Sequence, residues 1–359
     1  MKILDKYLLK KFLTTYVFAV FVIVLIILVI DYVEKNDDFI QKNAPTKEIL
    51  LTYYANLAPY WANYISPLMI FISTVFFTAK LASHTEIIAI LTNGVSFRRL
   101  MVPYIIGASL IGLFSFLMVG WALPKANAKR IGFENKYINE QFFFSDRDFH
   151  MAVAPDTYIY FSTYNNQSNT AFDFTIEKFE DNQLMEKLSA RRAMWIDSLE
   201  KWRLYDYKIR DIGIMKDNLT ISRTHIDTTL SMYPTDFESG HSVQETFTIG
   251  ELNDQIALLK SRGSEGIEPF LIERYQRFAT PFAVIILSVM GLIVSAQKRR
   301  GGVGLQIAIG FLLAFTYILF YIMSKGIAES GNMSPLLAVW LPNIVFGFIA
   351  FIMYFTVPK

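Results

Sequence analysis

Six long apolar stretches dominate the pattern of hydrophobic and polar positions along the chain. Each has roughly the 20 residues that a helix needs to cross a bilayer at about 1.5 Å per residue. The predicted spans are residues 12–30, 53–81, 101–123, 279–296, 306–323 and 336–357. The pattern therefore predicts an α-helical membrane protein with six transmembrane helices, three before and three after a long mixed segment (a 3+3 plan).

The first span is predicted to stay in the mature protein. A cleaved signal peptide has an apolar core of about 7–15 residues that ends in small residues. Here the apolar run is longer and ends in LIILVIDYVEK. In the second span, Pro59 and Pro67 remove backbone donors and predict a kinked helix packed on protein. The third span carries Gly107 and Gly112 among other small residues, which predicts a close helix contact.

Residues 124–268 have a different character. Short segments such as TYIYFSTY, FDFTIEKFE and KWRLYDYKIRDI alternate polar with aromatic or β-branched residues and end in turn residues. Strands at this spacing predict an inserted all-β domain, a sandwich or jelly roll. The expected organisation is residues 1–123 with spans one to three, 124–268 as the jelly-roll-like domain, and 269–359 with spans four to six.

A short helix at about residues 83–94 separates spans two and three. Ser83 and Glu86 have the spacing of a capping box, and Asn93-Gly94 predicts a left-handed stop. The helix between them is too short to span a bilayer and too apolar for water. It lies either at the lipid headgroups, beside Arg98 and Arg99, or in a groove of a partner protein.

Basic residues in the short loops set the expected orientation. With a cytoplasmic N-terminus, one side collects most of them, and the other side holds fewer, mixed with acidic residues. The residues on the first side are Lys2, Lys6, Lys10, Lys11, Lys80, Arg98, Arg99, Lys298, Arg299, Arg300 and Lys359. The sequence therefore predicts cytoplasmic termini, a cytoplasmic helix at 83–94, and an outer, periplasmic β domain.

Composition excludes several functions. Hydrophobic residues make up 53% and charged residues 18%, while the net charge of +2 is too small for a nucleic-acid binder. The chain has no cysteine, and its four histidines are scattered, without a metal-binding pattern. The dipeptide Gly-Lys of a phosphate loop does not occur. We therefore expect no catalytic residue, no metal and no cofactor in this chain, with any ATP and Mg²⁺ bound by a separate ATPase.

Four pieces of sequence carry a resemblance. ILDKYLLKKF, SHTEIIAILTNGVSFRRL, TIGELNDQIALLKSRG and ERYQRFATPFAV occur in that order on the six-span plan. Together they resemble the LptF/LptG family of lipopolysaccharide-export permeases, and ILDKY is more similar to the LptG-like members. The resemblance covers essentially the whole chain.

The resemblance implies that the protein works in a multi-protein transport complex. Such permeases pair with a second LptF/LptG-like chain, sit on a dimer of an LptB-like ATPase in the bacterial inner membrane, and pass lipopolysaccharide to LptC/LptA-like periplasmic jelly rolls. In the family, a glutamate, apolar residues and a Gly-x-Ser in the loop after span two dock in the ATPase. The matching residues here are Glu86, Ile87, Ala89, Leu91, Gly94 and Ser96.

Phosphates on the exported lipid require cations near the outer ends of the spans. Lys35, Lys42, Arg274 and Arg277 lie at that height, and arginine can grip phosphate with two donors. The alternative is that these side chains only snorkel to the interface. Lys35 is followed by two aspartates, a departure from family members that are basic there.

Other functions remain open at this point. One is the permease of another ABC-type exporter, carrying a lipoprotein or a peptide. A second is a receptor or scaffold that binds a ligand outside and an effector inside, although the chain has no effector domain. An intramembrane enzyme is a third, disfavoured by spans that are nearly free of ionisable residues.

Overall fold

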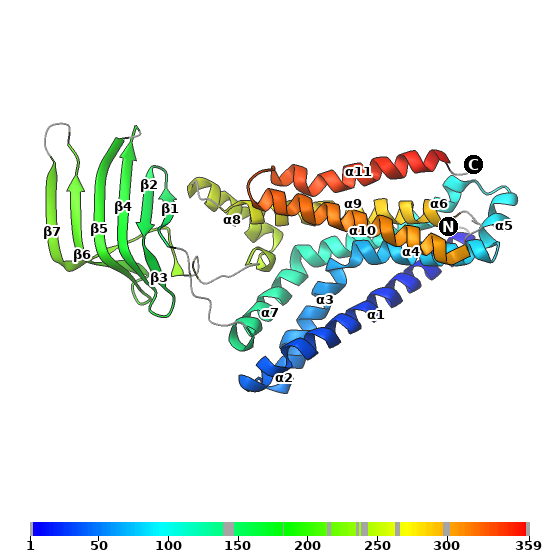
Figure 1. Ribbon diagram of the computed structural model, residues 1–359, viewed down its shortest axis with the longest axis horizontal. Coiled ribbons are helices and arrows are strands. Elements are labelled where there is room, and N and C mark those ends of the chain that lie inside the picture. Colours follow the sequence, from blue (N-terminus) through cyan, green and yellow to red (C-terminus); the bar gives the residue numbers. More distant parts are fainter. Residues whose placement is uncertain are drawn as a thin grey trace. The chain divides into compact units, whose positions relative to one another are not determined.

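The computed structural model forms two compact units (Figure 1). The first comprises residues 1–138, 244–250 and 268–359, and the second 139–243 and 251–267. The structure describes residues 3–138, 147–181, 183–213, 217–234, 237, 243–262, 266–296 and 302–356. The predicted basic loop with Lys298, Arg299 and Arg300, and the terminal Lys2 and Lys359, lie outside the described residues.

The six predicted membrane spans are confirmed within the part of the chain that the structure describes. The two longest, Ile3–Gln41 and Phe97–Tyr137, extend beyond the apolar stretch into segments that contain charged residues. The helices of this part are α1 Ile3–Gln41, α2 Thr46–Glu48, η1 Ile49–Tyr54, α3 Ala55–Tyr64, α4 Ser66–Ser83, α5 Glu86–Thr92, α6 Phe97–Leu117, η2 Met118–Ala122, α7 Leu123–Tyr137, η4 Val243–Thr246, α8 Ile249–Arg262, α9 Glu268–Ser295, α10 Gly302–Glu329 and α11 Pro335–Thr356.

The second span is interrupted, as its prolines predict. α3 ends at Tyr64, Ile65 stands between the helices, and α4 starts at Ser66 with Pro67 in its first turn. A proline in the first turn of a helix removes no intrahelical hydrogen bond. The span is therefore built from two helices, and its break lies beside the cavity described below.

α9 is the central helix of the first unit, and α4, α6 and α11 pack around it. The small residues of the third span do make close contacts. A Cβ placed on Gly112 would lie 3.2 Å from the Pro281 backbone in α9, and one on Gly107 would meet the Phe12 ring in α1 at 2.5 Å. Glycine lets these helices approach where any side chain would separate them.

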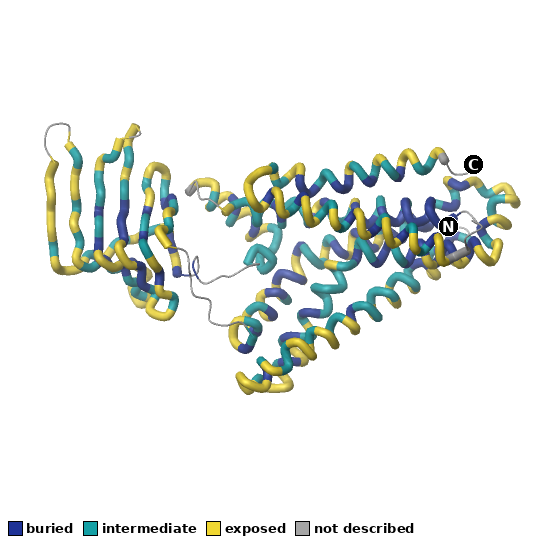
Figure 2. The backbone as a smooth tube through the Cα atoms, viewed as in Figure 1, coloured by how far each residue is buried: buried dark blue, intermediate teal, exposed yellow. Residues whose placement is uncertain are grey.

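α1 is the least buried span. Only 6% of its apolar window is buried, against 61% for α9. Its exposed residues include Val17, Phe18 and Phe21, and Figure 2 shows exposed segments along much of this helix. Apolar surface of this extent is stable against lipid or another protein, not against water.

The boundary of the inserted unit differs from the expected residue 124. α7 continues the third span to Tyr137, with Leu123, Asn127, Arg130, Phe133 and Tyr137 buried at helical spacing. Pro124 does not stop it, because it stands in the first turn of α7. At the other end, residues 249–262 form α8 and not a strand. The predicted strands are therefore confined to the middle of the 124–268 segment.

The inserted β domain is confirmed as an antiparallel sheet. Its described strands follow the order β1-β2-β4-β5-β6-β7, with β3 paired to β4. Trp202 and Phe174 are fully buried on the packed face, and the Trp202 indole donates a 2.8 Å hydrogen bond to the Met232 carbonyl. The strands are β1 Phe149–Ala154, β2 Thr157–Phe161, β3 Thr163–Asn165, β4 Thr170–Glu180, β5 Gln183–Ile196, β6 Lys201–Asp211 and β7 Asn218–Thr228.

Candidate functional site

The first candidate site is α5, and it starts differently from the prediction. Thr85, not Ser83, is the N-cap, and it has a left-handed φ of 63°. The Ser83 hydroxyl instead donates back to the Lys80 carbonyl at 2.8 Å, so the predicted capping box is wrong. Since β-branched residues rarely adopt positive φ, the local preference of Thr85 does not explain the turn before Glu86.

The Gly-x-Ser sequence joins α5 to α6. Gly94 has a φ of 81°, which confirms the predicted left-handed stop. Ser96 then caps α6 by accepting a hydrogen bond from the Arg99 backbone N–H at 3.4 Å. Next to it, the Arg98 guanidinium donates to the Tyr354 hydroxyl of α11 at 2.8 Å. Gly94, which ends α5, and Ser96, which caps α6, therefore set the angle between the two helices.

The apolar residues of α5 divide between two faces. Ile87 is fully buried in the core of the helical unit, and Leu91 packs partly against that core. Ile88 is 41% exposed, and Ala89 and Thr92 are exposed beside it. Of the predicted docking residues, the structure thus leaves Ala89 exposed and turns Ile87 inward, and it also exposes Ile88, which is not in the predicted set.

Polar contacts connect this region to α1. The Tyr7 hydroxyl donates to the Glu86 carboxylate at 3.2 Å. Two residues earlier on α1, Asp5 forms an ion pair with Arg99 of α6, and the Asp5 side chain is 6% exposed. The start of α1 is therefore joined to both helices on either side of Gly94.

The structure does not gather the four predicted head-group cations. Lys35 forms an ion pair with Asp31 at 3.0 Å, and Lys42 donates to the Ile138 carbonyl at 3.4 Å. The Arg274 guanidinium lies 5.7 Å from the centre of the Tyr275 ring. Arg277 alone lines the cavity described next.

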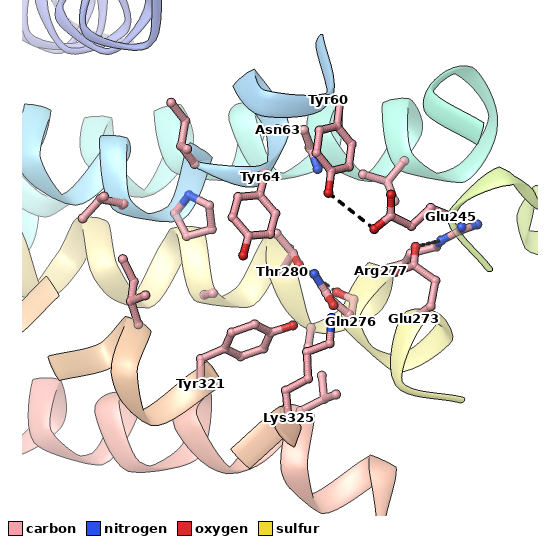
Figure 3. A pocket seen from close by; sticks show the side chains of 18 of the residues that line it. Tyr60, Asn63, Tyr64, Glu245, Glu273, Gln276, Arg277, Thr280, Tyr321 and Lys325 are labelled. Atoms are coloured by element: carbon pink, nitrogen blue, oxygen red, sulfur yellow. Dashed lines mark hydrogen bonds and ion pairs between the residues drawn. The ribbon is translucent and has the colours of Figure 1, made fainter. Parts of the chain in front are cut away.

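The second candidate site is a cavity of about 230 Å³ inside the first unit. It lies between α3, α9 and α10, with α4, α7, η4 and α11 completing its lining. In Figure 3, Tyr60 and Tyr64 extend from α3, while Tyr321 and Lys325 extend from α10. The lining is mostly apolar, with polar groups at the end near η4. Such a mixture is typical of a site for an amphipathic ligand.

The Arg277 guanidinium makes its polar contacts with other groups of the same chain. It pairs with Glu273 at 2.8 Å and donates to the Phe247 and Gln244 carbonyls at 2.8 and 3.4 Å. Its side chain is 1% exposed. These bonds hold the residues around η4 against α9, so Arg277 fixes one wall of the cavity.

The Glu245 carboxylate on η4 has longer hydrogen bonds than the Arg277 guanidinium, so its negative charge is less well compensated. Its nearest donors, the Tyr60 hydroxyl and the Arg130 guanidinium, are each 3.4 Å away. Burial raises the pKa of the Glu245 carboxyl above its usual value, the neighbouring Glu273 adds to the rise, and Arg130 opposes it. The carboxylate therefore lies at the cavity with unused acceptor capacity.

Sequence reasoning missed most of this cavity. Tyr321 and Lys325 are four residues apart, as are Glu273 and Arg277, so each pair shares one face of its helix. A stripe of polar residues along one face of an apolar helix therefore could have predicted a polar site between the spans. Nothing local linked Glu245 to these stripes, because it reaches the cavity from the segment that returns from the sheet.

A family model described as "Lipopolysaccharide export system permease LptF/LptG" matches residues 6–355. The chain belongs to this family. No curated protein sequence compared with the chain matches it. The LptF/LptG proteins are permease components and not enzymes, so this chain is a multi-pass membrane permease of lipopolysaccharide export. Membership agrees with the resemblance found in the sequence, while the leaning to LptG stays a prediction.

Proposed function

We propose that this LptF/LptG protein is one of two permease subunits of an ATP-driven exporter in the bacterial inner membrane. The second permease is another LptF/LptG-like chain, and an LptB-like ATPase dimer binds ATP and Mg²⁺. The complex extracts lipopolysaccharide and passes it through the β domain to LptC/LptA-like jelly rolls. Family membership and the largely exposed apolar surface of α1, which suits a second subunit or lipid, support this proposal.

The observation that carries the ATPase contact is the open face of α5. Ile88, Ala89 and Thr92 are exposed on one side while Ile87 anchors the other in the bundle. An apolar face on a short helix suits insertion into a groove of another protein. Glu86, at the edge of this face, can meet a basic group of the ATPase.

Motion of α5 would reach the spans through the contacts at its ends. The bonds from Tyr7 to Glu86 and from Asp5 to Arg99 connect it to α1 and α6. When the ATPase closes, α5 would carry these helices as rigid bodies, and a space between the two permeases would narrow around the lipid. Lys35, Lys42 and Arg274 are proposed to contact its phosphates. Arg277 is left out of this set because its own chain occupies its donors.

In the proposed orientation, α5 and both termini lie in the cytoplasm and the sheet lies in the periplasm. The cluster of basic residues at the α5 end, including Arg98 and Arg99, supports this direction. Labelling cysteines introduced at His84, before α5, and at Leu219, both exposed, from either side of the membrane tests it. Labelling of Leu219→Cys from the cytoplasm would reverse the assignment.

The docking claim is tested with Ile88→Glu. A charge buried in an apolar groove is costly, and each 1.4 kcal/mol lost corresponds to about a tenfold drop in affinity. We expect at least tenfold less ATPase to co-purify with the variant, and ATP-dependent lipopolysaccharide release to fall with it. The matched control is Ile221→Glu, at a 60% exposed isoleucine of β7, which should retain the ATPase. Normal co-purification with Ile88→Glu would refute docking through this face.

A further inference from the structure

The cavity between α3, α9 and α10 lies within one chain and does not include α5. Its volume of about 230 Å³ suits a polar head group better than a whole lipid. Ile65, Leu68 and Ile322 contribute apolar surface to its lining. A bound amphiphile would therefore place its head among the polar groups and its chains along this apolar wall.

Three side chains in the lining have a buried polar atom that finds no hydrogen-bond partner among the residues the structure describes. These atoms are Gln276 Oε1, Asn127 Oδ1 and the Tyr321 hydroxyl oxygen. A buried polar atom left unpaired costs about 1–3 kcal/mol, so several in one cavity indicate that something else completes their bonds. Two of them are acceptors that need a donor, and the tyrosine can also donate.

The lining also carries charges of both signs with spare capacity. Lys325 is 3.7 Å from Glu329, beyond a normal hydrogen bond, and both side chains are partly exposed. Such a pair is weak, and it leaves the ammonium able to bind an anion. Among the described residues, Glu245 at the η4 end accepts hydrogen bonds from side chains only at the two 3.4 Å contacts described above, and its attraction to Lys325 involves no hydrogen bond. A ligand with one anionic group for Lys325 and one cationic group for Glu245 would pair with both side chains.

We propose that the cavity binds the head group of a phosphoethanolamine lipid, one per chain. The phosphate contacts Lys325 and the Tyr321 hydroxyl. The ammonium donates to Glu245 and, after rotation of the two amide side chains toward the cavity, to the unpaired oxygens of Gln276 and Asn127. The lipid then acts as a structural wedge that holds α3 apart from α10, next to the break at Ile65.

The choice of head group follows from charge. A phosphoglycerol head group offers the anion but no cation for Glu245, and it would add a net negative charge to a cavity that already contains Glu245 and Glu273. A simple cation would satisfy the acceptors but leave Lys325 and the apolar wall unused. A head group with a phosphate next to an ammonium can pair with Lys325 and with Glu245 at the same time.

The test uses the full-length chain extracted from membranes together with the proteins that co-purify with it. The complex is incubated in vesicles that contain equal amounts of phosphatidylethanolamine and phosphatidylglycerol with the same acyl chains. Retained lipids are then counted by native mass spectrometry. We expect one phosphatidylethanolamine per chain, retained at least tenfold over phosphatidylglycerol. Equal retention of the two lipids would overturn the proposal.

Variants locate the site. Lys325→Met and Tyr321→Phe should each lower phosphatidylethanolamine retention about tenfold, and Glu245→Gln should reduce the preference over phosphatidylglycerol. Lys80→Met changes an exposed lysine of α4 outside the cavity and should leave retention unchanged. If Lys325→Met does not fold, Tyr321→Phe, which removes a single oxygen, decides the question. Wild-type retention in Tyr321→Phe would refute the site.

A further arm adds lipopolysaccharide as a competitor. Retention of phosphatidylethanolamine in its presence supports a separate structural lipid, whereas displacement would assign the cavity to the exported substrate and overturn the proposal. None of these outcomes depends on the ATPase contact, because Ile88→Glu is measured by co-purification and leaves the cavity intact.

Discussion

Tyr7, near the start of α1, donates a hydrogen bond to Glu86, the first residue of α5, with 3.2 Å between the two oxygens. The residues are 79 positions apart in the chain, and the bond joins the most exposed span to the shortest helix of the bundle core. In the proposed exporter, the same carboxylate faces the ATPase. Because the Glu86 carboxylate contacts both α1 and, in this proposal, the ATPase, a movement of the ATPase can be transmitted to α1.

Replacing Tyr7 by phenylalanine should weaken this connection without removing the docking face. A hydrogen bond contributes about 0.5–1.5 kcal/mol, so we expect ATP-dependent lipopolysaccharide release to fall about two- to tenfold. Co-purification of the ATPase should stay normal. The control is Tyr32→Phe on the same helix, at a 49% exposed tyrosine. Equal release by the two variants would mean that the Tyr7 hydroxyl has no role in transmission.

Gly112 should tolerate no side chain. A Cβ there would lie 3.2 Å from backbone atoms of Pro281, which cannot move away as a flexible side chain can. Overpacking of this kind costs about 1–3 kcal/mol, so Gly112→Ala should lower the unfolding temperature of the purified protein. Gly132→Ala is the control, because that glycine has nothing within 4 Å of its Cβ position. Within α7 it should be neutral or stabilising by up to about 1 kcal/mol.

The features that could be predicted from the sequence are those determined by local pattern. Hydropathy located the six spans, and Gly94 and Pro67 marked ends of helices through their own backbone preferences. The capping box failed because the N-cap is Thr85, at a positive φ that a β-branched residue rarely adopts and that the sequence pattern does not indicate. α7 was missed because its sequence, residues 123–137, is polar enough to be grouped with the β segment that follows, although Pro124 occupies the first turn of a helix.

The cavity could not be predicted for a different reason. Its polar residues come from helices that are distant in sequence, and each polar group has an ordinary explanation on its own helix. Arg277 is an example, since height in the membrane predicted contact with lipid phosphate, whereas the folded chain surrounds it with Glu273 and backbone carbonyls. Only packing shows that Glu245 and Lys325 line one space.

The Glu245 carboxyl should make stability depend on pH. Its folded pKa lies above the unfolded value of about 4.3, because burial and Glu273 disfavour the charged form. The folded state therefore holds the proton more tightly. This contribution is complete below the unfolded pKa and is lost as pH rises through the folded pKa. Glutamine resembles the protonated form, so the stability of Glu245→Gln relative to wild type should increase as pH rises above about 4.3.

The measurement is the unfolding temperature of both proteins between about pH 2.5 and pH 8, which includes the titration of both carboxyls, expressed as variant minus wild type. Asp227→Asn in the sheet supplies a control of opposite sign. The hydrogen bonds from Arg203 hold the pKa of Asp227 below its usual value, so that carboxylate stabilises above the unfolded pKa of about 3.9 and its contribution is lost as pH falls through the folded pKa. A difference for Glu245→Gln that stays flat or falls with rising pH would show that Arg130 compensates the charge fully, despite the 3.4 Å separation.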